Sequence, residues 1–335
     1  MKVVKLIAAL ASALALAVVA APANAADKVK IAMVVKSLGN GFFDAAHEGG
    51  NEAAKELGDV DLIYTGPTAP TAEAQIEVIN SLISQKVDAL VISANDKDAL
   101  VPICKRAMQR GIKVISFDSG VAAGGRLMQL NPSNNALIGL KLAQMANDAT
   151  GSAGGDIAIL SATAQATNQN IWIGEMKKAL AKPEFARLKL VNVVYGDDQS
   201  DKSYREALGL LRSNPNLKVI VAPTTVGIVA AAKAVADEKL IGKVYVTGLG
   251  LPSEMAGHVH SGAVKSFAIW NPIDLGYTAT ELAYAFVKGK ATGKEGEEIA
   301  AGRMGKIKIE GDNEAAMAPP FTYDASNIDK FAKVF

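Results

Sequence analysis

Short, nearly continuous apolar runs alternate along the chain with longer segments whose apolar residues recur at helical spacing. In the first half, these runs predict strands at residues 31–35, 62–64, 89–93 and 114–117. The segments between them predict helices at residues 44–57, 71–86 and 98–111, the last ended by a glycine as helix C-termini often are. Strands that alternate with helices in this way indicate an α/β fold, with a parallel sheet covered by helices on both faces.

The second half repeats this order. It predicts strands at residues 156–160, 190–195, 218–222 and 244–247, with helices from residue 171 and at 201–212 and 226–237. The loops that follow the strands correspond: 36–43 matches 161–170, 93–96 matches 222–225, and 118–120 matches 248–250. We therefore expect two similar lobes whose strand ends face each other across a cleft.

Proline-bearing breaks at residues 130–133 and 271–272 are suited to connections between the lobes. A further helix is predicted at 275–288 and a late strand at 305–310. We expect an N-terminal lobe of residues 26–130 and about 272–303. The C-terminal lobe should hold residues 131–271 and about 304–335, and a multi-segment hinge should join the two.

The loop at residues 36–43 is the first candidate site, because open α/β sheets bind ligands at the carboxyl ends of their strands. It contains neither the glycine pattern of dinucleotide-binding loops nor that of nucleotide-binding P-loops. It offers instead a cation (Lys36), an amide (Asn40) and two rings (Phe42 and Phe43). Apolar faces with a few polar groups suit a small polyhydroxylated molecule.

The other strand ends add polar and aromatic candidates. Asp118 can accept hydrogen bonds from two adjacent hydroxyls, and such charge-assisted bonds are roughly twice as strong as neutral ones. Asn168 and Gln169 supply both donors and acceptors, as a sugar's hydroxyls require. The predicted ligand-binding set is Lys36, Asn40, Phe42, Phe43, Asp118, Asn168, Gln169, Pro223, Thr224, Thr225, Trp270 and Asn271.

Several of these residues have a plainer interpretation. Either phenylalanine can belong to the core, and Asp118 can serve as a turn residue. Asn168 can cap the helix predicted from residue 171. Trp270, at the end of an apolar strand, is either core or a stacking plate at the edge of the cleft.

The first residues predict export. Lys2 and Lys5 precede an apolar run at residues 6–21, and Ala23-Asn24-Ala25 is a small-x-small cleavage site. We expect a signal peptide of residues 1–25, cleaved after Ala25, and a protein in the periplasm. The run is too short and alanine-rich for a good membrane anchor, and no later stretch approaches a membrane span.

Composition narrows the function classes. The 335 residues, with 35 basic and 34 acidic side chains, are long enough for two domains, and the net charge of +1 favours neither nucleic acid nor an anionic membrane. The single cysteine, Cys104, lies on an apolar helix face and reads as a buried hydrophobe. His47, His258 and His260 lack metal-ligand spacing and read as solvated surface residues. No hydrolase or metalloprotease motif is present, so we expect no metal, no cofactor and no enzyme activity.

Several motifs resemble one known family. They are residues 41–43 (GFF), 64–68 (YTGPT), 105–111 (KRAMQRG), 167–172 (TNQNIW) and the strand ending in Trp270. They resemble type I periplasmic sugar-binding proteins of ABC importers, within the branch that binds rhamnose or autoinducer-2. The resemblance implies two lobes with a three-segment hinge, closure around one monosaccharide, and docking of a monomer onto permease subunits in the inner membrane.

Within that branch, autoinducer-2 receptors use a lysine, two aspartates, a glutamine, a proline and an alanine. This chain resembles them at Lys36, Asp118, Gln169 and Pro223, and departs at Asn168 and Thr225, where they carry the second aspartate and the alanine. Residues 221–227 and 271–277 are similar to rhamnose-binding proteins. The resemblance therefore favours rhamnose, whose methyl group Phe42, Phe43 or Trp270 could contact.

Other interpretations stay open. Within the binding-protein class, the ligand could be autoinducer-2, another deoxysugar, a pentose or a polyol. Outside it, sugar-responsive regulators share a two-lobed fold, but those begin with a helix-turn-helix whereas a signal peptide is expected here. An enzyme on a doubly wound sheet is the third class, and the absence of a catalytic motif speaks against it.

Overall fold

Six parallel strands form the sheet of the first lobe in the computed structural model, which describes residues 28–335. Their order is β13 (Glu314–Ala316), β5 (Gln129–Asn131), β4 (Lys113–Phe117), β3 (Ala89–Ile92), β1 (Val29–Val34) and β2 (Val60–Thr65). The register sets Ala32 of β1 between Ile63 of β2 and Leu90 of β3. The predicted signal peptide lies outside the described residues.

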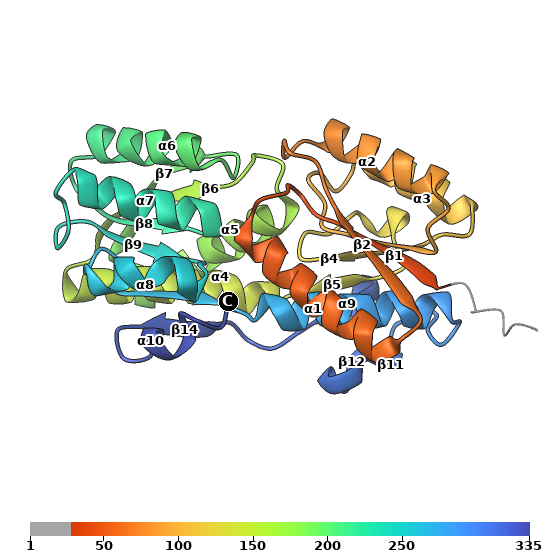
Figure 1. Ribbon diagram of the computed structural model, residues 1–335. Helices are drawn as coiled ribbons and strands as arrows, with labels where there is room; N and C mark the ends of the chain where they lie inside the picture. Colours follow the sequence, from red (N-terminus) through yellow and green to blue (C-terminus); the bar gives the residue numbers. More distant parts are fainter. Residues whose placement is uncertain (1–27) are drawn as a thin grey trace, which may run out of the picture.

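Helices cover both faces of this sheet (Figure 1). The side chains of β1 alternate: Ala32 and Val34 join the core beneath α2 (Ala72–Ser84) and α3 (Val101–Gln109). Ile31 and Met33 point to the opposite face, which α1 (Gly41–Leu57) and α9 (Pro272–Val287) cover. Burial on both faces explains why the strand is a continuous apolar run.

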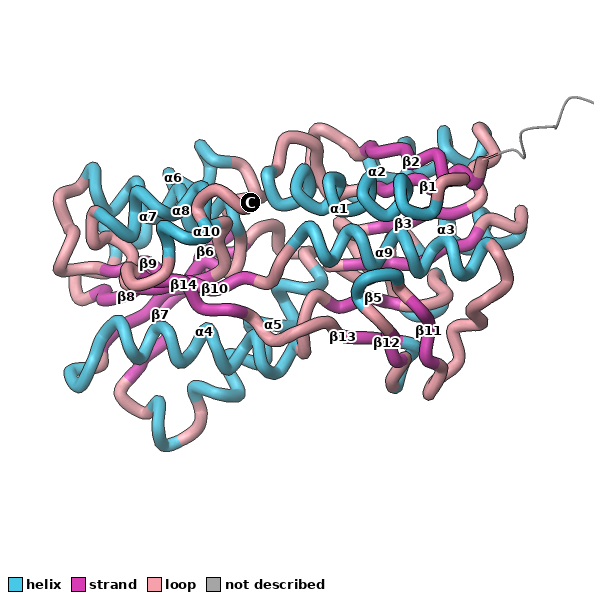
Figure 2. Tube along the Cα trace, turned by 60° about the horizontal axis from the view of Figure 1, so that its bottom comes forward, coloured by secondary structure: helices cyan, strands magenta, loops and turns pink. Residues whose placement is uncertain are grey.

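The second lobe is built on four parallel strands in the order β7 (Leu188–Tyr195), β6 (Gly155–Ser161), β8 (Leu217–Ala222) and β9 (Tyr245–Gly248). Figure 2 shows α4 (Asn135–Thr150) and α5 (Thr167–Leu180) on one side of these strands. The opposite side carries α6 (Ser200–Ser213) and α7 (Thr225–Asp237). Isolated bridges connect β9 to β10 (Ser266–Ile269), which pairs antiparallel with β14 (Phe321–Asp324). The remaining α-helices and strands are α8 (Pro252–His260), α10 (Ile328–Phe331) and the hairpin of β11 (Glu298–Ala300) and β12 (Lys306–Lys308).

The predicted α/β fold of two similar lobes is confirmed. The strand order β2-β1-β3-β4 of the first lobe recurs as β7-β6-β8-β9 in the second. The sequence did not predict α4 or the three-residue strands β5, β11 and β13. Within residues 28–335, no helix is both long enough and apolar enough to span a membrane.

Two helices begin earlier than expected. Asn40 accepts a hydrogen bond from the Phe42 amide at 3.0 Å, so it caps α1, and the helix starts at Gly41 rather than at residue 44. Phe42 and Phe43 therefore lie on the first helical turn instead of in a loop. Likewise, α5 starts at Thr167, and both Asn168 and Gln169 belong to its first turn.

The chain passes between the lobes three times: after β5, after β10 and between β13 and β14 (Figure 2). The last crossing corrects one expected boundary. Residues from about 304 were expected in the C-terminal lobe, but β13 pairs with β5 in the first sheet, and the chain joins the second lobe only from β14 onward, with α10 against α8. Three residues with two alanines carry too weak a pattern to predict this long-range pairing.

Two reciprocal glycine contacts hold α1 against α9. A Cβ on Gly49 would lie 1.8 Å from the Ile273 carbonyl oxygen, and one on Gly276 would lie 1.8 Å from the Ala46 carbonyl oxygen. Only glycine permits such a close approach of two helix backbones. Because α1 carries Phe42 and Phe43 and α9 begins where the chain crosses between the lobes for the second time, this contact holds the two rings in position next to the hinge.

We predict that Gly49→Ala lowers the free energy of unfolding by about 1–3 kcal/mol, because the added methyl forces the helices apart. The measurement is urea denaturation. Gly209→Ala in α6 is the control, since a Cβ there meets nothing within 4 Å. It should raise stability by about 0.5–1 kcal/mol through its helix propensity. Equal stability of Gly49→Ala and the native protein would contradict the close contact.

Candidate functional site

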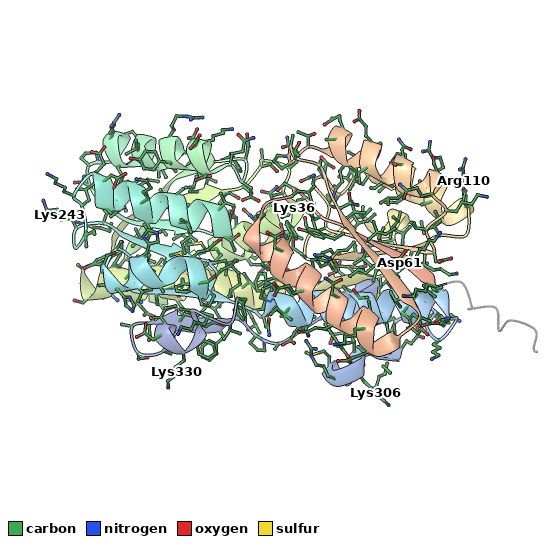
Figure 3. The ribbon with its side chains drawn as sticks, in the orientation of Figure 1. Lys36, Asp61, Arg110, Lys243, Lys306 and Lys330 are labelled. Carbon is green, nitrogen blue, oxygen red and sulfur yellow. The ribbon has the colours of Figure 1, made fainter. Side chains whose placement is uncertain are left out.

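A cavity lies between the two lobes, at the carboxyl ends of both sheets, and Figure 3 shows Lys36 at this boundary. The volume that the centre of a water molecule can occupy in this cavity is about 40 Å³. One water needs about 10–15 Å³ by this measure, so the space suits a few waters or one small ligand. Its lining is Lys36, Asn40, Phe42, Phe43, Asp118, Asn168, Gln169, Trp172, Asp198, Pro223, Thr224, Thr225, Leu249, Ile269 and Trp270.

Every residue of the predicted set except Asn271 lines this cavity. Asn271 instead caps α9: its side-chain oxygen accepts from the Ile273 and Asp274 amides, and its amide donates to Asp274. The structure thus places Asn271 outside the cavity lining, at a position where an asparagine before a proline is a typical helix start.

Lys36 is the one cation among the lining residues. It follows β1, and its Nζ lies 3.6 Å from Asp118 Oδ2 and 3.5 Å from Asn168 Oδ1. It also lies 5.9 Å from the centre of the Phe43 ring, within cation–π range. Only 6% of Lys36 is exposed, so these partners replace the water that its charge would otherwise hold.

Asp118 faces both lobes. Ser93 of its own lobe donates to Oδ2 at 2.8 Å, and Asn168 of the other lobe donates to Oδ1 at 2.9 Å. Its backbone has a φ of +55°, a left-handed conformation that aspartate tolerates better than most residues. The alternative of a simple turn residue is therefore incomplete, since the carboxylate is 4% exposed and bonded across the lobe boundary.

The first turn of α5 supplies two amides. Asn168 does not cap the helix; the N-cap residue is Ala166, which forms no side-chain hydrogen bond to it. The Asn168 side-chain oxygen accepts from the Gln169 backbone amide, and Asn168 Nδ2 donates to Asp118. Gln169 Oε1 accepts from Ser161 Oγ at 2.7 Å and from the Ala162 amide at 2.8 Å. With this oxygen occupied, the Gln169 NH₂ group remains to donate into the cavity.

Aromatic rings cover the side of the cavity next to the hinge. Phe42 meets Phe43 and Trp270 edge-on, at centroid distances of 5.3 and 6.1 Å. Trp270 also meets Trp172 at 5.4 Å. Phe43 and Trp270 are 1% and 6% exposed, so each is packed like core and also lines the cavity. Their burial agrees with the core interpretation, and a stacking role for Trp270 stays a prediction.

The sequence prediction missed Trp172, Asp198, Leu249 and Ile269. Asp198 is partly buried, and Thr224 Oγ1 donates to its Oδ1. Burial raises the pKa of Asp198, while the Lys36 charge and the Thr224 hydrogen bond oppose this rise. The sequence offered one signal for Asp198: it follows β7, and this loop corresponds to the one after β2 in the first lobe.

A second layer of hydrogen bonds positions Lys36. Gln75 of α2 is fully buried and donates to the Val35 and Ser93 carbonyls at 3.1 and 2.8 Å. Its oxygen accepts from the Asn95 amide at 2.9 Å, and Asn95 Nδ2 donates to the Lys36 carbonyl at 2.9 Å. One glutamine therefore joins the loops after β1 and β3 and satisfies backbone groups that water cannot reach.

Other reactive residues lie away from the cavity. Cys104 is buried as predicted, and burial raises the pKa of its thiol to about 12. Of the histidines expected at the surface, His260 is exposed, but His47 and His258 are partly buried, and His47 stacks on Tyr64. Across residues 28–335, no group of three or more histidine, cysteine, aspartate or glutamate side chains is arranged to hold a metal ion.

Two lobes that enclose a small polar cavity at their strand ends define a solute-binding protein. Residues 31–291 match the family described as periplasmic binding protein domain, and the chain belongs to that family. The predicted family is thus confirmed. One of the relatives below is an ABC transporter solute-binding protein and another is a sugar-binding protein, so the chain is classed with binding proteins and not with enzymes.

Three similar proteins illustrate the range of ligands and sequence identities. An ABC transporter solute-binding protein from Clostridium phytofermentans with bound L-rhamnose is 39% identical, with a TM-score of 0.88 over 92% of this chain and 99% of that one. The D-ribose/D-allose-binding protein of Pseudomonas aeruginosa is 30% identical over 68% of this chain and 72% of the relative. LsrB from Clostridium saccharobutylicum in complex with AI-2 is 20% identical, with a TM-score of 0.85 over 90% of this chain and 99% of that one, which shows the shared fold alone.

We predict that Gln75→Leu lowers the free energy of unfolding by about 3 kcal/mol or more. Each buried backbone group left without a partner costs about 1–3 kcal/mol, and three lose theirs. Chemical denaturation measures the change. Gln85→Leu, at the exposed end of the same helix, serves as the control and should stay within about 0.5 kcal/mol. A Gln75 variant as stable as the control would contradict the proposed bracing of the two loops.

Proposed function

We propose that this protein is the periplasmic solute-binding component of an ABC importer for a neutral monosaccharide, with rhamnose as the first candidate. The observation that carries the proposal is the cavity itself. Two carboxylates, Asp118 and Asp198, and amides from both lobes meet there beside a layer of aromatic rings, and nothing in the lining forms a catalytic set. The protein binds the sugar without changing any of its bonds.

The distribution of polar groups between the lobes explains how binding drives closure. Asp118 and Lys36 belong to the first lobe, and Asn168 and Gln169 to the second. A sugar that bonds to both sets favours the state in which the lobes are closed, by the difference between its affinities for the two states. We infer that the closed protein, as a monomer, is the form that permease subunits in the inner membrane recognise.

The affinity that such a receptor needs is attainable without metal or covalent chemistry. A micromolar dissociation constant corresponds to about −8 kcal/mol. Spread over roughly a dozen heavy atoms, this is about −0.7 kcal/mol each, inside the ceiling of about −1.5 for very small ligands.

The choice of rhamnose has two supports. The 39% identical Clostridium phytofermentans protein was solved with bound L-rhamnose. The lining also offers an apolar surface, from Phe42, Phe43 and Trp270, that suits a methyl group in place of a hydroxymethyl. Relatives named for binding allose and ribose keep pentoses and other hexoses as alternatives.

Autoinducer-2 is the second candidate, since the cavity contains Lys36, Asp118, Gln169 and Pro223. Against it stands Asn168, whose amide donates to Asp118 at 2.9 Å. An aspartate at position 168 would place a second carboxylate beside Asp118, and the two would repel each other. The hydrogen bond observed here therefore requires the amide of Asn168.

We expect purified protein to show a rise in melting temperature of about 5 °C or more with L-rhamnose at one hundred times its dissociation constant. Ligand bound only to the native state adds about 2.7 kcal/mol under these conditions. A thermal-shift panel should include D-allose, D-ribose, D-arabinose, a polyol and autoinducer-2. A shift with autoinducer-2 and with none of the sugars would refute the sugar assignment.

We expect Asp118→Asn to weaken binding of that sugar about 100-fold. It removes charged acceptors worth about 1.5–3 kcal/mol per hydrogen bond, while asparagine still tolerates the left-handed backbone. Isothermal titration calorimetry measures the loss. Asp98→Asn, which changes an exposed carboxylate paired only with Lys97, should bind as the native protein does. Unchanged affinity of Asp118→Asn would remove Asp118 from the site.

A further inference from the structure

The cavity contains a second carboxylate, from the other lobe. Asp198 follows β7 and lines the same space as Lys36 and Asp118. Thr224, which caps α7, donates to Asp198 Oδ1. No group in residues 28–335 donates to Oδ2, and this atom is not among the side-chain atoms sealed from solvent without a partner. One oxygen is therefore held in place while the other is open to a ligand.

The backbone separates Asp198 from its neighbour Asp197. Both residues are left-handed, with φ of 50° and 55°, which costs roughly 1–2 kcal/mol for each non-glycine residue. Asp197 pairs with Lys202 at 2.5 Å and lines an outer groove instead of the cavity. Two adjacent aspartates in one strained turn thus have different environments, and only Asp198 reaches the site. Conformations of this cost persist where surrounding contacts hold them, often at ligand sites.

The charges in the cavity do not balance. Lys36 is the single lining cation, and it faces two carboxylates, one from each lobe. A neutral polyol can donate hydroxyls to both without adding charge. A sugar acid or sugar phosphate would bring a third negative charge into a space with one lysine, where like charges repel strongly because water is largely excluded.

We propose that Asp198 is a ligand-binding carboxylate of the second lobe and that, together with Asp118, it restricts the site to neutral hydroxyl-rich ligands and excludes sugar acids and sugar phosphates. This inference rests on the proposed function, because it assumes that the cavity is the sugar site. The two carboxylates accept hydrogen bonds from the ligand on opposite lobes, so Asp198 contributes to closure of the lobes as well as to the selection of neutral ligands.

The test compares Asp198→Asn with Asp197→Asn by isothermal titration calorimetry, using the neutral sugar that the native protein binds, L-rhamnose first. Asparagine keeps an oxygen for Thr224 and tolerates the left-handed backbone. We expect the dissociation constant to rise at least tenfold for Asp198→Asn and to stay within twofold for Asp197→Asn. Melting temperatures of both variants without ligand check that each is folded.

A second measurement needs no variant. Sodium D-glucuronate and rhamnose 1-phosphate, each at millimolar concentration, should give no heat of binding with the native protein. Binding of either anion as tightly as the neutral sugar would overturn the exclusion of anions. Neutral-sugar binding that is equal in the Asp198→Asn and native proteins would overturn the role of Asp198 and leave the proposed function intact. A native protein that binds no neutral sugar would overturn both.

Discussion

The hydrogen bond from Asn168 to Asp118 is the contact on which the closed arrangement depends, because it joins the two lobes through side chains that are only 5% and 4% exposed. A buried carboxylate needs several partners, and here they come from both halves of the molecule: Ser93 and Lys36 from the first, Asn168 from the second. When the lobes separate, these groups must be solvated instead. The polar groups of the site are therefore hydrogen-bonded in both states: to water when the lobes are open, and to the opposite lobe or a ligand when they are closed.

That balance requires both lobes to present their loops from the same side. The repeated strand order achieves this, since the central strands β1 and β6 end opposite each other and each feeds a helix whose first turn enters the cavity. The two first turns differ in chemistry. That of α1 carries Phe42 and Phe43, and that of α5 carries Asn168 and Gln169. The two equivalent first turns thus contribute apolar rings from one lobe and hydrogen-bonding amides from the other.

Much of this could be predicted from sequence, because strands buried on both faces leave unmistakable apolar runs and the residue after such a run must lie at the sheet edge. Lys36 and Asp118 follow from that rule. Asn271 lies outside the cavity lining, which its sequence context could not reveal because capping a helix and binding a ligand both favour asparagine. Asp198 was missed although the end of β7 was predicted at the right residue, because β7 is an edge strand and polar residues in the loop after an edge strand usually face solvent. The pairing of β13 with β5 joins residues far apart in sequence and leaves no local pattern.

The polar groups define a class of ligand more sharply than an individual one. Carboxylates, amides and a lysine can bond to the hydroxyls of many sugars, so they discriminate only where a missing hydroxyl leaves one of them unpaired. The apolar lining must then decide between a methyl and a hydroxymethyl group at the same ring position. Against Phe42 and Trp270, a hydroxyl would lose its water without gaining a partner, at a cost of about 1–3 kcal/mol on protein scales. A preference of that size is about fivefold to 150-fold, enough to favour a deoxysugar while permitting related sugars to bind.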